Sequence, residues 1–287
     1  MNIKKAVFPA AGFGTRFLPA TKAIPKEMLP LIDKPLIQYS VEEAKKSGLE
    51  EIIIITGMGK TAIEDHFDIS FELESLLKEK GKKEVLKMIQ EASNLIHFSY
   101  TRQKKPLGLG HAILCAKNLV GREPFAVFLS DDVIDSRVPV MKQMVSVFNK
   151  YPATILAVQR VPKKEVHKYG IIKAEKVKDR LYRVFDMVEK PHPSDAPSNL
   201  AIIGRYILSP EIFDALEKTR HGAGGEIQLT DGLRKIVKEQ DVYALEFEGT
   251  RYDAGDKLGF LMANVSYALK RDDLKDDFKR FLKGLIY

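Results

Sequence analysis

The sequence predicts an α/β protein with a Rossmann-like, doubly wound mixed sheet, a smaller accessory sheet and a C-terminal helical tail. Short β-rich runs alternate with segments of helical spacing through the first half of the chain. One run, at 51–56 (EIIIIT), is continuously apolar at its centre, as expected of a strand whose sheet is covered by helices on both faces. The second half is richer in strand-like runs, and the chain ends in a charged stretch of helical spacing.

The first half is expected to follow the alternating order of a doubly wound sheet. The apolar runs predict strands at 3–8, 51–56, 95–101, 125–130 and 154–159. The intervening segments predict a helix at 36–47, one or two helices within 68–92, and helices at 110–118 and 138–151. The first of these helices is expected to stop at Gly48, because glycine commonly terminates helices.

The second half is expected to supply the smaller sheet, antiparallel or mixed, packed on the first. Strands are predicted at 170–175, 180–188, 200–208 and 242–246, with helices at 210–218 and 226–238. The tail at 257–286 is predicted to be helical. No internal repeat or long linker divides the sequence, so we expect one domain over 1–287.

Composition indicates a soluble globular protein, with 45% hydrophobic and 30% charged residues. The formal charge of +7 favours anionic partners, but lysines are scattered, so nucleic acid is not expected as a partner. The single cysteine, Cys115, excludes an internal disulfide and suits a reducing compartment. We find no signal peptide and no apolar run of 18 or more residues, so we expect a cytoplasmic protein with no membrane partner.

A segment rich in small residues and cations follows the first predicted strand. Ala10, Ala11 and Gly12 leave backbone N–H groups open to an anion that a larger side chain would exclude. Arg16, Lys22 and Lys26 then place three cations within eleven residues. This combination of open backbone and positive charge is suited to a triphosphate.

Two other phosphate-binding motifs do not fit the sequence. The pair Gly12 and Gly14 lacks the third glycine of a dinucleotide fingerprint, because Phe17 stands in its place. The segment 57–61 (GMGKT) resembles the end of a P-loop, but the glycine required five places before Gly59 is Ile54. We interpret that segment as a tight strand-to-helix turn.

Carboxylates follow the predicted strand at 125–130. Ligands of α/β folds bind at the carboxyl ends of strands, and Mg²⁺ prefers oxygen ligands. Asp131 and Asp132 are both candidates, but successive residues point in different directions, so we expect only one to be a ligand.

The motif Gly12-Phe13-Gly14-Thr15-Arg16, with Lys22 and Pro25-Lys26-Glu27 behind it, resembles the signature of the sugar-nucleotide pyrophosphorylases. The sequence of 20–39 (ATKAIPKEMLPLIDKPLIQY) is similar to that of the bacterial UDP-glucose branch of the family. Further similarity lies at 64–74 (EDHFDISFELE), 199–206 (NLAIIGRY) and 222–231 (GAGGEIQLTD). The resemblance therefore covers essentially the whole chain.

The resemblance implies a Mg²⁺-dependent uridylyl transfer from UTP to glucose 1-phosphate, giving UDP-glucose and pyrophosphate. It implies a nucleotide-binding half at 1–160, a sugar-binding half at 161–256 and a helical tail at 257–287, in a homodimer or homotetramer. The implied catalytic cations are Arg16, Lys26 and Lys190, and the implied metal ligands are Asp131 and Asp253. The implied nucleotide-binding residues are Ala10, Ala11, Gly12, Gly14, Thr15, Lys22, Glu27, Gln103 and Gly108. The implied sugar-binding residues are Gly170, Glu189 and Asn199.

Three alternatives stay open at this point. A thymidylyl-, cytidylyl- or adenylyltransferase acting on the same sugar phosphate would share most of these residues. A non-catalytic nucleotide-sugar sensor would keep the pocket, although it would have no need of both Asp131 and Asp253. A nucleic-acid-binding protein comes third, because the aromatic stacking pattern of such proteins is missing.

Overall fold

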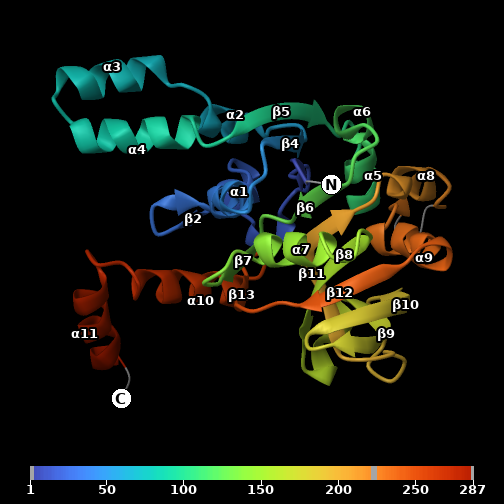
Figure 1. The fold of residues 1–287 in the computed structure, drawn as a ribbon. Coiled ribbons are helices and arrows are strands. Elements are labelled where there is room, and N and C mark those ends of the chain that lie inside the picture. Colours follow the sequence, from blue (N-terminus) through green and yellow to red (C-terminus); the bar gives the residue numbers. More distant parts are fainter. Residues whose placement is uncertain (1–2, 221–224, 286–287) are drawn as a thin grey trace.

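A nine-stranded mixed sheet forms the centre of the protein, in a computed structural model that describes residues 3–220 and 225–285 (Figure 1). The strand order is β5-β4-β1-β6-β11-β8-β12-β10-β9. In the same order the bounds are His97–Arg102, Glu51–Thr56, Lys5–Pro9, Phe125–Phe128, Leu200–Leu208, Thr154–Arg160, Val242–Glu246, Leu181–Glu189 and Gly170–Lys178. The predicted α/β fold class is confirmed.

The sheet changes character along its width. Strands β5, β4, β1 and β6 are parallel to one another, and β11 then pairs antiparallel with both β6 and β8. Alternate residues of β1 point to opposite faces, so Val7 belongs to one hydrophobic core cluster and Phe8 to another. Helices cover both faces, which explains why the centre of the strand EIIIIT can be continuously apolar.

Each core cluster is closed by its own set of helices. Val7 packs in the cluster closed by α5 (Leu109–Leu114), α8 (Glu211–Glu217) and α9 (Leu229–Glu239). Phe8 packs in the cluster closed by α1 (Leu36–Lys46), α2 (Thr61–Phe67) and α7 (Val140–Phe148). The helix predicted at 110–118 is divided into α5 and a short α6 (Lys117–Val120).

The smaller sheet is not built from the strands expected to form it. Strands β9 to β12 belong to the main sheet: β11 lies between β6 and β8, and the other edge of β8 is extended by β12, then β10, then β9. The accessory sheet is instead β7 (Asp132–Asp135) paired antiparallel with β13 (Thr250–Asp253). A third, minimal sheet pairs β2 (Pro30–Leu31) with β3 (Lys34–Pro35).

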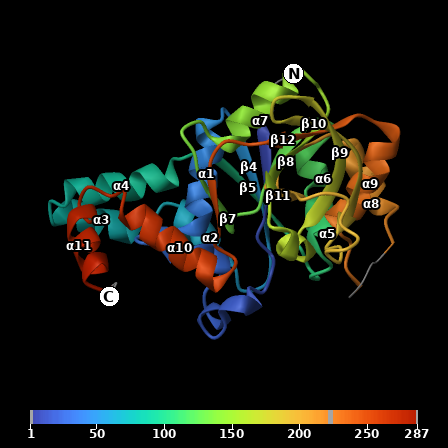
Figure 2. The same cartoon turned by 90° about the horizontal axis from the view of Figure 1, so that it is seen from below.

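Two helical segments, one at 71–93 and one at 257–285, lie on the same side of the molecule. The segment predicted to hold one or two helices forms the hairpin α3 (Phe71–Glu79) and α4 (Lys83–Ser93). The tail is two helices rather than one, α10 (Lys257–Ala268) and α11 (Lys275–Leu285). Both views place these four helices on the side opposite β9 and β10 (Figures 1 and 2).

The tail is attached to the body by packing and by charge. The Asp256 carboxylate caps α10 by accepting hydrogen bonds from the backbone N–H groups of Leu258 and Gly259. Ion pairs join Lys270 to Asp135 and Arg271 to Asp33.

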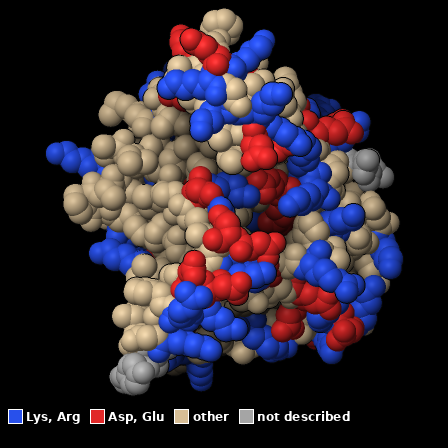
Figure 3. All heavy atoms as spheres, turned by 90° about the vertical axis from the view of Figure 1, so that its left-hand side faces the viewer, with Lys and Arg blue, Asp and Glu red and all other residues tan. Residues whose placement is uncertain are grey.

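Acidic and basic side chains lie close together over much of the face drawn in Figure 3. Among the helices at 3–220 and 225–285, none combines the length and apolarity needed to cross a bilayer.

Candidate active site

Two adjoining cavities open at the carboxyl ends of β1 and β6. Parallel strands place their carboxyl ends at one edge, which is where α/β folds bind ligands. The first cavity has a volume of about 340 Å³ and the second about 690 Å³. Asp131 lines both, so the two cavities meet at this carboxylate.

The first cavity collects most of the predicted nucleotide-binding residues. Its walls include Ala11, Gly12, Lys26, Glu27, Gln103, Gly108 and Asp131. Three short 3-10 turns, η1 (Thr15–Phe17), η2 (Ala20–Lys22) and η3 (Lys26–Met28), lead the chain from the loop after β1 back to the cavity. The loop and the end of β6 therefore face each other across the space.

Glu27 is held at the cavity wall by a lysine that the sequence did not single out. Lys60 Nζ donates to Glu27 Oε2 at 2.8 Å, and the two side chains are 7% and 2% exposed. Lys60 ends the turn between β4 and α2, so the predicted strand-to-helix turn is confirmed. The other carboxylate oxygen of Glu27 is buried and has no hydrogen-bond partner among residues 3–220 and 225–285. Such an oxygen at a cavity wall can accept a hydrogen bond from a ligand.

Lys26 and Asp131 form an ion pair at the junction of the cavities, with Lys26 Nζ 2.6 Å from Asp131 Oδ2. Burial lowers the pKa of Lys26, but the Asp131 and Glu27 carboxylates outweigh burial and hold that pKa above its usual value. Burial likewise opposes ionisation of Asp131, but Lys26 and Arg16 hold its pKa below the usual range. The pair is therefore charged on both sides at neutral pH.

Arg16, Asp131 and Asp253 converge on one backbone position in the second cavity. A Cβ atom at Gly255 would lie 2.8 Å from Asp131 Oδ2, 2.9 Å from Arg16 Nη2 and 3.2 Å from Asp253 Oδ1. Burial and the Asp132 carboxylate raise the pKa of Asp253, against the opposing effect of Arg251. Two carboxylates and a guanidinium thus share a small space that only glycine leaves open.

The far end of the second cavity carries the predicted sugar-side residues Gly170, Glu189 and Lys190. Glu189 Oε2 accepts a hydrogen bond of 2.6 Å from the Thr230 hydroxyl, which fixes the carboxylate. Lys190 Nζ lies 3.5 Å from Glu189 Oε1, and the Lys190 backbone is left-handed at φ 46°. Thr230 is a contact that the sequence did not indicate.

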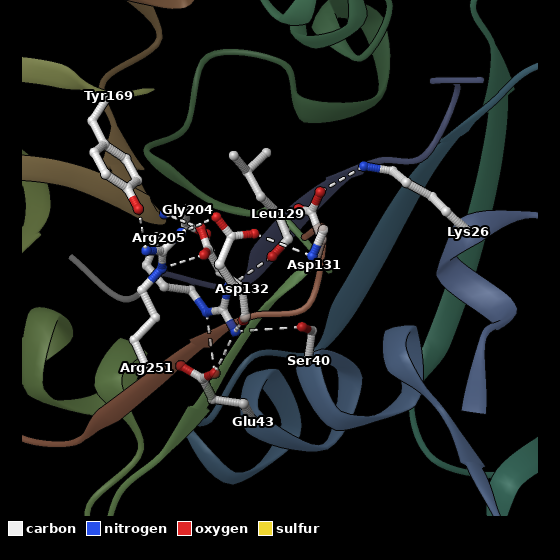
Figure 4. A network of polar contacts seen from close by, with 12 residues as sticks. Lys26, Ser40, Glu43, Leu129, Asp131, Asp132, Tyr169, Gly204, Arg205 and Arg251 are labelled. Atoms are coloured by element: carbon white, nitrogen blue, oxygen red, sulfur yellow. Dashed lines mark hydrogen bonds and ion pairs between the residues drawn. The ribbon is translucent and has the colours of Figure 1, made fainter. Parts of the chain in front are cut away.

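Asp132 is engaged by other groups, and its position differs from that of Asp131 (Figure 4). Its Oδ2 accepts from the Gly204 N–H at 2.8 Å, and its Oδ1 accepts from Arg251 Nε. Arg251 also lies 3.3 Å from Asp253 Oδ2 and donates to the Tyr169 hydroxyl at 3.1 Å. Arg251 therefore connects two carboxylates to the sugar-side wall.

Arg205 supports the strand end from beneath and is 1% exposed. Its guanidinium donates to the carbonyl oxygens of Leu129, Gly204 and Asp132 at 2.9–3.0 Å. It also pairs with Glu43 Oε2 at 2.8 Å (Figure 4). Sequence reasoning missed Arg205 and Arg251, although an arginine inside the apolar run LAIIGRYIL was a usable signal for the first.

Five predicted site residues are not in the walls of either cavity. They are Ala10, Gly14, Thr15, Lys22 and Asn199. Asn199 faces elsewhere, since its Oδ1 accepts a hydrogen bond from Arg160 at 3.2 Å. Gly14 shapes the loop, because a Cβ there would lie 2.9 Å from Lys26 Cβ. Part of the motif at 222–231, residues 222–224, lies outside the described residues.

A family model described as nucleotidyl transferase matches residues 5–269. The chain therefore belongs to the nucleotidyl transferase family. A UTP–glucose-1-phosphate uridylyltransferase of Bacillus subtilis (strain 168) is 53% identical over 285 residues, covering 99% of this chain and 98% of the relative. The predicted resemblance to this branch of the family is confirmed.

Solved structures agree with the sequence comparison. A UDP-glucose pyrophosphorylase complexed with UDP-glucose is 50% identical with a TM-score of 0.87, covering 94% of this chain and 100% of that chain. A UTP-bound UGPase from Acinetobacter baumannii is 40% identical with a TM-score of 0.91, covering 98% of each chain.

Proposed function

We propose that this protein transfers the uridylyl group of UTP to glucose 1-phosphate, giving UDP-glucose and pyrophosphate. The observation that carries the proposal is the pair of cavities that meet at Asp131. The first cavity is lined by the Gln103 amide, which is suited to the edge of a nucleobase, and the second is lined by the Glu189–Lys190 pair. A nucleotide and a sugar phosphate bound there would meet at the Lys26–Asp131 junction.

The segment 1–160 is proposed to hold UTP. The backbone of Ala10, Ala11 and Gly12 would contact the nucleotide, with Gln103 and Gly108 at the base. Arg16, Lys22 and Lys26 would face the triphosphate, whose roughly four negative charges must be offset by cations. Gly14, Thr15 and Glu27 complete this proposed nucleotide set. Lys22 lies outside the cavity walls and is exposed, so in this role its side chain would reach the phosphates from outside the cavity.

The segment 161–256 is proposed to hold glucose 1-phosphate. Glu189 would accept hydrogen bonds from sugar hydroxyls, while Lys190 would pair with the phosphate. Gly170 lies beside them, where a Cβ would come within 3.3 Å of Glu189 Oε2. Asn199 is the least supported member of the set, because its side chain faces Arg160.

The carboxylates near Gly255 fit a magnesium ion. Mg²⁺ is usually held by one or two carboxylates together with waters and substrate phosphates. Asp131 and Asp253 supply two carboxylates on the same space, and Asp253 also accepts from the Gly255 N–H at 3.1 Å and lies 3.3 Å from Arg251. Both oxygens of Asp132 are turned to Gly204 and Arg251. When bound, the ion would neutralise phosphate charge and orient the α-phosphate.

The proposed reaction is an in-line displacement. A phosphate oxygen of glucose 1-phosphate forms a bond to the α-phosphorus of UTP, and the bond to the bridging oxygen of pyrophosphate breaks. The attacking phosphate carries about −1.5 to −2 charges at neutral pH, so no general base is required. The side chains of Arg16, Lys26 and Lys190 position the two anions and offset their repulsion.

A nucleotide panel tests this function. Pyrophosphate release with glucose 1-phosphate and Mg²⁺ should be fastest with UTP when UTP, dTTP, CTP and ATP are compared at equal concentration. Faster turnover of CTP or ATP would assign the protein to another nucleotidyltransferase activity. Binding of UDP-glucose without any turnover would assign it to the sensors.

Replacing Glu189 by glutamine is expected to raise the KM for glucose 1-phosphate by about tenfold, because an amide nitrogen cannot accept a hydrogen bond from a sugar hydroxyl. The KM for UTP should stay within twofold, roughly, because the nucleotide cavity is not changed. The matched control is Glu175→Gln, at an exposed position of β9. Equal effects on both substrates would remove Glu189 from the sugar site.

We further propose a cytoplasmic homodimer or homotetramer. The single cysteine, Cys115, supports a reducing compartment. Phe71 of α3, Met88 of α4 and Phe281 of α11 expose more than half of their surface, which supports a subunit contact on that side.

A further inference from the structure

We infer that His111 is a specificity-determining positioning residue, which fixes the Gln103 amide so that the site accepts uracil and rejects cytosine. The inference rests on the proposed function, since it concerns how the same nucleotide cavity selects its base. It assigns a role to a side chain that belongs to neither the phosphate loop nor the sugar side.

The Gln103 side chain has a defined orientation. It is 7% exposed and lies at the wall of the nucleotide cavity. Its Nε2 lies 3.1 Å from the Gly108 carbonyl oxygen and 2.9 Å from His111 Nδ1. A carbonyl oxygen can only accept, so the amide atom that faces it must be the NH₂ group. The orientation is therefore dictated by chemistry.

This orientation also fixes the role of His111. The NH₂ group of Gln103 can only donate, so His111 Nδ1 must be the acceptor and the ring proton must lie on Nε2. Turning the amide over would place Oε1 against the Gly108 oxygen, which can only accept, and it would also require the His111 ring proton to move from Nε2 to Nδ1. With its proton on Nε2, His111 therefore holds the amide in the orientation that the Gly108 oxygen dictates.

With the amide in this orientation, Gln103 Oε1 is left as a hydrogen-bond acceptor at the wall of the nucleotide cavity. Gln103 Oε1 receives no hydrogen bond from the described residues, and the amide borders the cavity. The N3 atom of uracil carries a hydrogen and can donate to such an acceptor, whereas the N3 atom of cytosine is itself an acceptor. A buried site that is built to receive a hydrogen bond strongly rejects an analogue that lacks the donor.

Backbone hydrogen bonds fix the segment that carries His111, so the contact between His111 and Gln103 has a defined geometry. Gly110 N donates to the Ile227 oxygen at 2.8 Å, and Ile227 N donates to the Leu107 oxygen at 2.8 Å. Gly108 has φ 95°, and a Cβ there would lie 2.8 Å from the Ile227 oxygen. These contacts hold Gly108 and the first turn of α5 together, with His111 three residues beyond the glycine.

The test measures kcat/KM for UTP and for CTP with glucose 1-phosphate, using CTP as an inhibitor of UTP turnover if its own turnover is too slow. His111→Phe removes the acceptor but keeps a ring, and it should lower the UTP/CTP preference by about tenfold, mainly through the KM for UTP. His111→Asn, whose Oδ1 can take the place of Nδ1, should keep most of the preference. If the Phe variant does not fold, His111→Ala removes the same acceptor.

A double-mutant cycle separates positioning from general damage. In a Gln103→Ala background, His111→Phe should cause no further change in the UTP/CTP preference. General damage would lower turnover of both nucleotides alike. An unchanged preference in the folded His111→Phe or His111→Ala protein would overturn the inference. Failure of the unsubstituted protein to use UTP would instead overturn the proposed function.

Discussion

Replacing Lys26 by alanine is expected to lower kcat by about 10²–10³ with UTP and glucose 1-phosphate, by analogy with removing a preorganised oxyanion donor. Lys26 Nζ lies 2.6 Å from Asp131 Oδ2 at the junction of the two cavities. Its charge is retained at neutral pH, because the Asp131 and Glu27 carboxylates keep the Lys26 pKa high despite burial. Steady-state pyrophosphate release at saturating substrates measures the effect.

The control for this prediction is Lys34→Ala, a lysine that pairs with Glu42 outside both cavities. That variant should keep kcat close to the unsubstituted value. Near-normal kcat in a folded Lys26→Ala protein would place the chemistry elsewhere.

Replacing Arg205 by methionine is expected to lower the free energy of unfolding by about 3–5 kcal/mol, because it leaves a buried carboxylate unpaired. The Arg205 side chain is 1% exposed and Glu43 is 11% exposed. The substitution would also remove donors from the carbonyl oxygens of Leu129, Gly204 and Asp132. Methionine keeps part of the aliphatic stem but also loses the guanidinium contact over the Phe128 ring, where Cζ lies 4.7 Å from the ring centre.

Urea denaturation measures this change through the midpoint, with the slope unchanged. The matched control is Arg183→Met, since Arg183 is 53% exposed and its pair with Asp241 lies at the surface. That change should cost less than about 1 kcal/mol. Equal midpoints for the two variants would show that the Arg205 network contributes little to stability.

Elements whose pattern is local could be predicted from the sequence. The strands β4, β11 and β12 have the predicted bounds, because their apolar runs are bounded by polar residues on both sides. The partners of β9 to β12 could not be predicted, because pairing depends on contacts between strands far apart in the chain. The tail was predicted as helical, but its division at 269–274 was not.

The candidate site was predicted as a set of residue types more than as an arrangement. The small and cationic residues after β1 pointed to phosphate binding, but their pairing with Asp131, 105 residues away, needed the fold. The resemblance favoured Asp131 over Asp132 as a metal ligand, and the contact of Arg251 with Asp132, which no spacing rule reveals, supports that proposal. Lys60, Thr230 and Arg205 were missed because each acts through a partner distant in sequence.

The fate of the α-phosphate of UTP tests the central claim most directly. UTP labelled at the α-phosphorus is incubated with the protein, Mg²⁺ and glucose 1-phosphate, and the products are separated. The two-cavity site predicts that the label appears in UDP-glucose in step with pyrophosphate release, and only when glucose 1-phosphate is present. Label that appears in UMP, or that leaves UTP without glucose 1-phosphate, would contradict uridylyl transfer between two substrates that meet at Asp131.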